Sequence, residues 1–313
     1  MLFLRRILRI IFLLFILLNI VAAFHAYKFT HFYPDKEITV KKPEEMNAWD
    51  KTKAILFGIN YPKSKNTIAR DSGVQTIIFK TAEGLSIEGW YDSVRSAKGT
   101  VILFHGHGSS KSKILMEANA FQSMGYNTLL IDFRAHGGSE GRVCTIGFKE
   151  AEEVKLAYDY VQSKGEKSII LWGISMGAAA ITSAVHQYKL SPQKIILEMP
   201  FGTLKHAVEG RLKTMGLPKE PFASLLTFWG GTEQGFWAFD YKPNEYASEI
   251  RCPVLLQWGA MDARVTRAET ESIFNKLTVS NKKLVVYENA KHESLCKYDN
   301  PTWRKEVANF LRS

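Results

Sequence analysis

A glycine-flanked serine between an apolar segment and a small-residue segment constrains the fold of this chain more than any other feature. The residues are Gly173-Ile174-Ser175-Met176-Gly177; they follow the apolar run 168–172 and precede three alanines at 178–180. A serine on a sharp strand-to-helix turn has strained backbone, so the positions two before and two after it must be small, and its hydroxyl projects above the sheet. The pattern predicts a strand, a tight turn and a helix, with Ser175 beside the free N–H groups of the helix N-terminus.

Apolar runs alternate with helical patterns on both sides of this turn. The runs that predict strands of a mostly parallel sheet lie at 100–104, 127–133, 168–172, 194–198, 253–258 and 283–288. Helical patterns lie at 111–124, 147–164, 176–188, 266–277 and 301–311. Two further runs, 74–80 and 85–92, alternate in polarity and predict a pair of antiparallel strands. This order of elements predicts an α/β fold with a doubly wound, mostly parallel sheet.

The segment 201–250 interrupts the alternation of strands and helices. It is too long for a simple loop, so we expect a cap inserted into the main domain. The expected organisation is therefore a membrane anchor or signal segment at 1–24, a stalk and lead-in at 25–73, and an α/β domain at 74–313 that carries the cap.

The N-terminus has the pattern of a signal peptide or signal anchor. Arg5, Arg6 and Arg9 precede an apolar run that reaches Phe24. We favour an uncleaved single membrane segment; cleavage near Val21-Ala22-Ala23 would instead give a secreted or periplasmic protein. In both cases the positive-inside rule keeps the arginines cytoplasmic and places the main domain outside the cytoplasm.

Charge and cysteine content narrow the classes of partner. The formal net charge of +10 favours proximity to anionic lipid headgroups, but the basic residues are dispersed and accompany no nucleic-acid reader motif. Three cysteines leave one unpaired, so the chain is not a disulfide framework. No spacing suggests a metal site. We therefore expect no nucleic-acid partner, no metal and no cofactor.

Two further residues fall at the ends of predicted strands. Asp262 follows the strand at 253–258, and His292 follows the strand at 283–288, so both belong to the sheet edge that carries Ser175. Serine, acid and histidine in this order predict a catalytic triad in which Ser175 attacks, His292 transfers its proton and Asp262 orients the imidazole. Taken singly, Asp262 is also consistent with a helix cap and His292 with a surface loop. Glu198, at the end of the strand at 194–198, is the alternative acid.

Two backbone N–H groups are expected to stabilise the oxyanion. One belongs to Met176, directly after the nucleophile. The other is assigned to His107, in the glycine-bearing turn 105–110 that follows the first buried strand. The side chains of His105 and His107 are expected to be structural, because no third metal ligand lies near them in sequence.

Five motifs together resemble the α/β-hydrolase superfamily: residues 103–108, 132–139, 173–177, 259–262 and 291–293. Within it they are similar to the clan of serine aminopeptidases and monoacylglycerol lipase-like enzymes, which includes membrane-anchored α/β-hydrolase-domain proteins. The resemblance covers about residues 74–312 and implies esterase, lipase, thioesterase or peptidase activity without choosing among them. One departure is Ala135, where many relatives carry glycine. In the same loop, His136 is expected to shape the rim of the site.

The cap is rich in aromatic residues, which bind acyl chains when they line a concavity. We expect Phe228, Trp229, Phe236 and Trp237 to contact substrate, although such rings also serve to pack a cap onto its domain. The sequence thus predicts a serine hydrolase that cleaves an ester or thioester of an apolar, lipid-like acyl group through an acyl-serine intermediate. The alternatives are a serine peptidase of the aminopeptidase type and a non-catalytic binding protein of the same fold.

Overall fold

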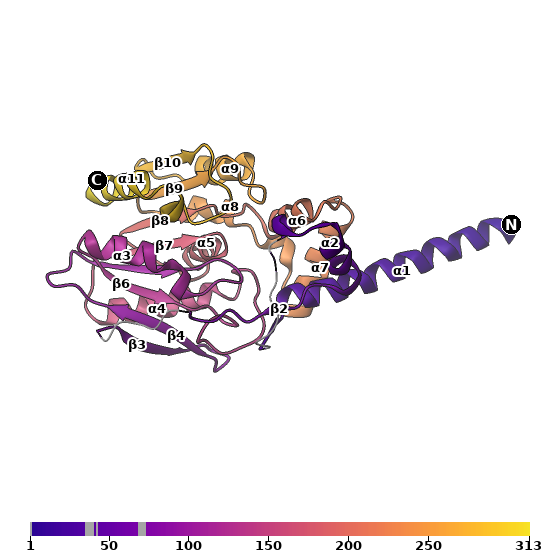
Figure 1. The fold of residues 1–313 in the computed structure, drawn as a ribbon, viewed down its shortest axis with the longest axis horizontal. Helices are drawn as coiled ribbons and strands as arrows, with labels where there is room; N and C mark the ends of the chain where they lie inside the picture. Colours follow the sequence, from indigo (N-terminus) through magenta and orange to yellow (C-terminus); the bar gives the residue numbers. More distant parts are fainter. Residues whose placement is uncertain (1, 35–40, 42, 68–72) are drawn as a thin grey trace.

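Eight strands form one sheet in the order β10-β9-β8-β7-β5-β6-β4-β3 in the computed structural model, which describes residues 2–34, 41, 43–67 and 73–313 (Figure 1). The strands are β3 Gln75–Lys80, β4 Ser86–Asp92, β5 Thr100–Phe104, β6 Asn127–Ile131, β7 Ile169–Ile174, β8 Lys194–Glu198, β9 Val254–Gly259 and β10 Lys282–Tyr287. β4 runs antiparallel to β3 and to β6, and the other neighbours are parallel. Every residue of β5, β8 and β9 is buried, as expected for strands covered on both faces. The predicted fold class is confirmed.

Helices cover both faces of this sheet. The helices are α3 Leu115–Ser123, α4 Ala151–Ser163, α5 Met176–Tyr188, α9 Arg267–Lys276, α10 Leu295–Tyr298 and α11 Asn300–Arg312. The connection from β5 to β6 runs in the opposite direction along the sheet from the connections β6–β7, β7–β8 and β9–β10. Because parallel crossovers are right-handed, α3 lies on one face and α4, α5 and α9 lie on the other. The rings of Phe121 in α3 and Trp303 in α11 pack edge to face, which places α11 beside α3.

Two predicted helices begin later than expected. The segment 111–124 starts with a 3₁₀ turn, Lys111–Ile114, before α3. The predicted helix 147–164 begins only at Ala151, because the carboxylate of Glu150 holds the preceding loop in place. It accepts hydrogen bonds from the Thr145 N–H at 2.9 Å, the Thr145 hydroxyl at 2.7 Å and the Gly147 N–H at 2.7 Å.

The cap lies between β8 and β9. It contains α6 Leu204–Met215, α7 Phe222–Gln234, the 3₁₀ turns Ala238–Asp240 and Ala247–Glu249, and α8 Pro243–Tyr246. Helices α6 and α7 pack against each other, and α7 also packs against the N-terminal helix. The cap therefore joins the α/β domain to the N-terminal segment.

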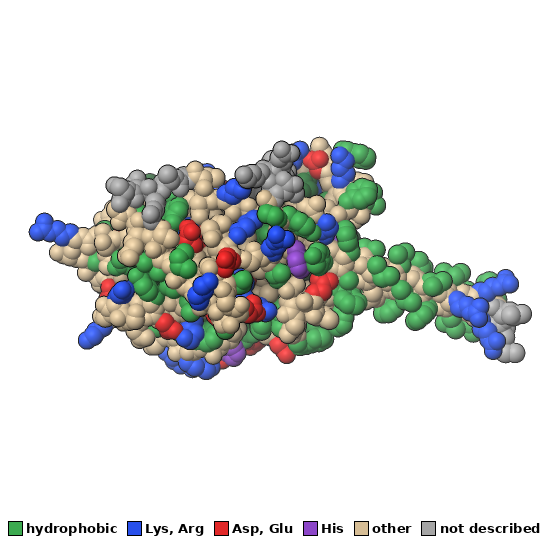
Figure 2. All heavy atoms as spheres, turned by 90° about the horizontal axis from the view of Figure 1, so that it is seen from below, with side chains coloured by type: hydrophobic (Ala, Val, Ile, Leu, Met, Phe, Trp, Pro, Cys, Tyr) green, Lys and Arg blue, Asp and Glu red, His purple; other side chains and the backbone are tan. Residues whose placement is uncertain are grey.

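The N-terminal helix α1, Leu2–Thr30, is longer than the predicted apolar segment and projects from the body (Figures 1 and 2). Its side chains are exposed from Phe3 to Leu17, and the three arginines lie near its free end. It is long and apolar enough to cross a membrane. Towards its other end Ala22 and Ala26 are buried, and the Trp229 indole N–H on α7 donates to Asn19 at 3.1 Å.

The described part of the predicted stalk is folded against the cap. It contains the 3₁₀ turn Pro43–Glu45, α2 Ala48–Phe57 and the two-stranded parallel pair β1 Phe32–Tyr33 and β2 Tyr61–Pro62. The Lys51 ammonium donates to the Thr214 carbonyl on α6 at 3.1 Å. In the same stretch Phe32 is buried, and its N–H donates to the Arg142 carbonyl of the α/β domain at 2.7 Å. Positions 35–40, 42 and 68–72 of that stretch lie outside the described residues.

Candidate active site

Ser175 lies at the turn between β7 and α5 in strained backbone. Its φ is +54°, in the left-handed region that non-glycine residues rarely adopt, and its N–H donates to the Glu198 carbonyl at 2.7 Å. A Cβ on Gly173 would stand 2.6 Å from the backbone of Gly177, and a Cβ on Gly177 would stand 2.3 Å from the Phe104 carbonyl oxygen. Both flanking positions therefore require glycine because β7 and β5 approach the start of α5 so closely.

Ser175, His292 and Asp262 form a chain of hydrogen bonds. His292 Nε2 lies 2.9 Å from Ser175 Oγ, and His292 Nδ1 lies 2.6 Å from Asp262 Oδ2. The other oxygen of Asp262 accepts the backbone N–H groups of Arg264 at 2.7 Å and Val265 at 3.0 Å. The loops after β7, β9 and β10 thus converge at one edge of the sheet, as the sequence predicts.

The partners on each side fix the direction of these bonds. An ionised carboxylate only accepts hydrogen bonds, so the proton on the His292 ring sits on Nδ1 and is donated to Asp262. This leaves the lone pair of Nε2 facing the Ser175 hydroxyl, which donates to it. The arrangement is able to remove the serine proton and to stabilise the resulting imidazolium.

Glu198, the alternative acid, does not contact His292. Its Oε1 accepts the indole N–H groups of Trp172 at 3.0 Å and Trp303 at 2.6 Å. Burial raises the pKa of Glu198 to about 8, so the carboxyl is mainly protonated at neutral pH. Asp262, with its two backbone donors, is the acid beside the imidazole.

The two expected oxyanion donors border the same cavity as Ser175. Residues that line this cavity of about 60 Å³ include Ser175, Met176, His107 and His292. Within the part of the chain that the structure describes, the backbone N–H groups of Met176 and His107 donate no hydrogen bond to protein. Both N–H groups therefore remain available to a ligand.

Three histidines, His105, His107 and His136, lie in or beside the turn 105–110. His136 Nε2 accepts the Gly108 N–H at 3.0 Å, and His105 Nε2 accepts the Phe133 N–H at 3.2 Å. Burial lowers the pKa of His105 to about 3 and also lowers the pKa values of His136 and His107, so all three rings are neutral. Among the residues described, no group of three His, Cys, Asp or Glu side chains is placed to hold a metal ion.

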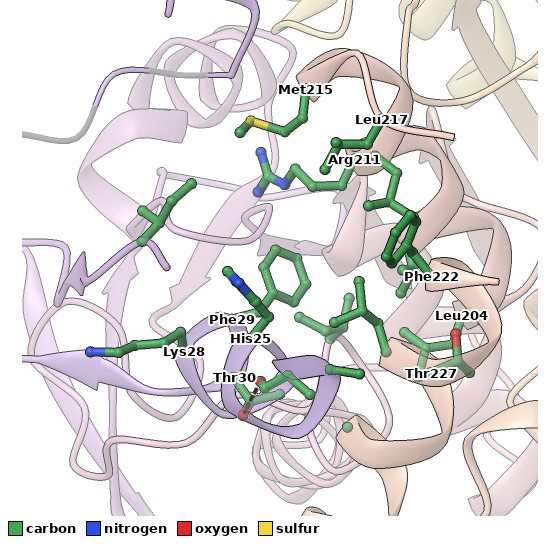
Figure 3. Close-up of a pocket in the computed structure, with 18 of the residues that line it drawn as sticks. His25, Lys28, Phe29, Thr30, Leu204, Arg211, Met215, Leu217, Phe222 and Thr227 are labelled. Atoms are coloured by element: carbon green, nitrogen blue, oxygen red, sulfur yellow. Dashed lines mark hydrogen bonds between the residues drawn. The ribbon is translucent and has the colours of Figure 1, made fainter. Parts of the chain in front are cut away.

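A larger, almost wholly apolar cavity of about 220 Å³ adjoins the cavity at Ser175 (Figure 3). Phe29, Ile146 and Arg211 line both. Most of the walls of the larger cavity come from α1, α2, α6 and α7. The space between the cap and α1 therefore lies next to the cavity at the nucleophile, with Phe29, Ile146 and Arg211 between the two.

The predicted substrate contacts are only partly placed on these walls. Phe236 lines the larger cavity and stacks on Phe148 with ring centroids 4.1 Å apart. Trp229 instead bonds to α1, and Phe228 and Trp237 are exposed, so these three do not line either cavity. Sequence reasoning missed the α1 contribution. The available signal was the small or apolar residues Ala22, Ala26 and Phe29, which recur at helical spacing after the exposed part of α1.

Solved structures share this architecture. An esterase of Pyrococcus furiosus, Pf2001, superposes with a TM-score of 0.65 at 22% identity over 80% of this chain and 98% of its own. The chain has the α/β-hydrolase fold. An esterase of Exiguobacterium antarcticum aligns with a TM-score of 0.58 at 15% identity over 76% of this chain and 100% of its own.

Sequence comparisons agree with the fold. The profile described as serine aminopeptidase, S33, matches residues 95–228. An uncharacterised Bacillus subtilis protein, YqkD, is 26% identical over 75% of this chain and 78% of its own length. The lysophosphatidylserine lipase ABHD12 of Xenopus tropicalis is 23% identical over 70% of this chain. The match spans 56% of that lipase, a little over half of its length.

Proposed function

We propose that this α/β-hydrolase is a membrane-anchored serine hydrolase that cleaves carboxylic esters or thioesters of an apolar acyl group. One observation carries the proposal: the hydrogen-bonded chain Asp262–His292–Ser175 borders a cavity that lies next to a larger apolar one and shares three lining residues with it. The esterase fold neighbours and the lipase relative support hydrolysis of esters.

The first half of the reaction forms an acyl-serine. Ser175 Oγ attacks the carbonyl carbon while its proton passes to His292 Nε2, and Asp262 stabilises the imidazolium. The carbonyl oxygen becomes an oxyanion that accepts the N–H groups of Met176 and His107; one such donor is typically worth about 10²–10³ in rate. When the intermediate collapses, the bond to the alcohol or thiol breaks, and this leaving group takes the proton from His292.

Water completes the cycle. His292 removes a proton from a water molecule, whose oxygen attacks the acyl carbon of the acyl-serine. The second tetrahedral intermediate releases the carboxylic acid, and the proton on His292 returns to Ser175 Oγ. No other group is consumed, so the chain needs no cofactor for this chemistry.

The charges around Ser175 favour an anionic ester over a peptide amino terminus. Two guanidinium groups, Arg211 and Arg264, line the cavity at the nucleophile, and the described residues that line it include no Asp or Glu. Arg264 is already paired with the Glu44 carboxylate through Nε at 2.6 Å and Nη2 at 3.0 Å, which leaves Arg211 as the cation without a carboxylate partner among the described residues. An aminopeptidase must hold the substrate ammonium group, which Arg211 would repel. We therefore place the peptidase alternative second, and assign to Arg211 an anionic group near the scissile ester, such as the headgroup phosphate of a lysophospholipid.

Anchoring follows from α1. Its apolar exposed part spans the membrane, and its arginines stay on the cytoplasmic side, which places the α/β domain outside the cytoplasm. Cleavage near Ala23 would remove side chains that wall the larger cavity, among them Ala22. The packing thus favours an uncleaved anchor over a signal peptide.

The test is covalent labelling followed by a substrate panel. A fluorophosphonate should label Ser175 in the full-length protein in detergent, and the Ser175→Ala variant should not be labelled. A series of p-nitrophenyl esters from acetate to palmitate, with an aminoacyl p-nitroanilide beside it, should give turnover of esters alone. Absence of Ser175-dependent labelling would refute the proposal. If the anilide is hydrolysed faster than every ester, the peptidase alternative replaces it.

A further inference from the structure

We propose that helix α1 is part of the substrate site: its body-proximal part forms one wall of the acyl-binding cavity, and the acyl chain of a single-chain lipid enters this cavity directly from the bilayer. The inference rests on the proposed function, because it gives the larger cavity its occupant. It adds a role to α1 that anchoring alone does not require.

One stripe of α1 lines the cavity. The stripe contributes Leu18, Val21, Ala22, His25, Ala26 and Phe29. These positions follow the spacing of one helical face. Ala22 and Ala26 are buried, and because their side chains are small they leave space for the cavity between α1 and the cap helices α6 and α7. Figure 3 shows Phe29 and His25 of α1 on one side of the cavity and Phe222 and Leu204 of the cap on the other.

The wall reaches the catalytic residues. The Phe29 ring stacks on the His107 imidazole, with centroids 5.1 Å apart and planes 21° apart. The Arg211 side chain lies over the Phe29 ring, with its guanidinium carbon 5.3 Å from the ring centroid. A chain lying along α1 therefore ends beside Ser175, where Phe29 and Arg211 line both cavities.

The other end of the wall lies in the leaflet on the side of the α/β domain. From Ile10, the first residue after the three arginines, to Val21 the helix extends about 17 Å at about 1.5 Å per residue, a little over half of the roughly 30 Å of a hydrocarbon core. Leu18 and Val21 are thus at the membrane-facing end of the cavity. An acyl chain in the adjacent leaflet therefore lies at the same depth in the membrane as this end of the cavity.

Exposed apolar side chains surround this end of the cavity. α2 presents Trp49, Leu56 and Phe57, the last with 69% of its surface exposed, and the cap presents Phe228 and Trp237, the last 56% exposed. α2, α6 and α7 gather on the side of the body from which α1 projects (Figure 1), and Figure 2 shows hydrophobic side chains along α1 and beside its base. Such rings sit at the headgroup level of membranes, so the cap face lies on the bilayer and no water separates the lipid from the cavity.

The test fills the cavity from the α1 side. In Ala26→Phe a ring occupies the space of the acyl chain, whereas the matched variant Ala23→Phe carries the same change at a position of α1 that does not line the cavity. In proteoliposomes, the ratio of kcat/KM for the palmitate ester over the butyrate ester should fall about tenfold or more in Ala26→Phe and stay near the unsubstituted value in Ala23→Phe. Fluorophosphonate labelling of Ser175 reports that each variant is folded.

A second measurement needs no substitution. A fluorophosphonate with a hexadecyl chain that ends in a diazirine is bound to Ser175 and then irradiated. Cross-links to the peptide of residues 18–30 support the inference. Cross-links confined to other segments, or an unchanged ester ratio in labelled Ala26→Phe, overturn it and leave the proposed function intact. Loss of all Ser175-dependent labelling in the unsubstituted protein would overturn both.

Discussion

The aromatic ring of Phe29, in the last turn of α1, stacks on the imidazole of His107, whose backbone N–H is the assigned oxyanion donor. The centroids are 5.1 Å apart, and Phe32 and Tyr61 pack around the same imidazole. His107 carries no hydrogen bond on its Nε2, so aromatic packing holds this side of the ring. The N-terminal helix α1 and the loop that carries His107 are thereby in direct contact.

Phe29→Ala should slow the chemical step. The substitution removes a stacked pair worth about 0.5–1.5 kcal/mol and leaves the loop at His107 free to move, so we expect kcat on the butyrate ester to fall about tenfold. Phe15→Ala, on the exposed part of α1, is the matched control and should keep the original kcat. A kcat in Phe29→Ala equal to that of the control would show that the stack does not position the donor.

Removing the nucleophile or its base should abolish turnover. We expect Ser175→Ala and His292→Ala to reduce kcat by about 10⁴–10⁶, because the Ser175 hydroxyl is the one that bonds to His292 Nε2 among the described residues. Residual activity within tenfold of the original in Ser175→Ala would refute the assignment of the nucleophile.

The acid of the triad is tested separately. Asp262→Asn should reduce kcat by about 10⁴, because an amide favours the wrong imidazole tautomer. Glu198→Gln should leave kcat within a few-fold, since its carboxyl is bound by two indoles and does not contact His292. The opposite order of the two effects would reassign the acid to Glu198.

Local rules account for what the sequence predicts correctly. β5, β8 and α5 have the predicted bounds, since a fully apolar run or a small-residue helix after a turn has few alternative states. Ser175, Asp262 and His292, the residues of the proposed triad, follow strands whose carboxyl ends meet at one edge, so parallel topology places them near one another.

What the sequence leaves open depends on tertiary packing. The Trp229 side chain bonds to α1 and does not line the cavity, and the Glu150 carboxylate binds the loop before α4. The part of the predicted stalk around Phe32 folds onto the α/β domain, where the Phe32 ring packs against the imidazole of His107. The contacts of Trp229 and Phe32 depend on partners far away in sequence, which no local pattern identifies. Glu150 bonds to Thr145 and Gly147, which are near in sequence, but a helical pattern does not tell that its side chain folds back onto them.

Arg211 should determine preference for substrates with an anionic headgroup. The guanidinium lines both cavities and makes no side-chain ion pair within the part of the chain that is described. Arg211→Gln keeps a polar side chain of similar reach but removes the charge. We expect kcat/KM on a lysophospholipid to fall about tenfold relative to that on a monoacylglycerol with the same chain, as for the loss of a charge-assisted hydrogen bond. Arg251→Gln, remote from both cavities, is the control, and an unchanged ratio would remove Arg211 from headgroup binding.

Glu198 should make the folded state less stable as the pH rises. Burial raises its pKa from an ordinary value of 4.5 to about 8, and the nearby Glu117 carboxyl adds to the rise. The folded protein therefore favours the protonated carboxyl. Its contribution to the free energy of unfolding is fully present below about pH 4.5 and is lost as the pH rises towards 8.

Glu198→Gln removes this titration but keeps an oxygen that accepts from Trp172 and Trp303. The Tm of the variant minus that of the unsubstituted protein should therefore increase from pH 5 to pH 8, measured in detergent at constant ionic strength. Glu288→Gln, at an exposed position, should show no such trend. A difference in Tm for Glu198→Gln that stays constant over this range would mean that the folded protein holds Glu198 ionised. The two indoles would then be binding a carboxylate, and the loop at Ser175, whose N–H donates to the Glu198 carbonyl, would lie beside a buried negative charge.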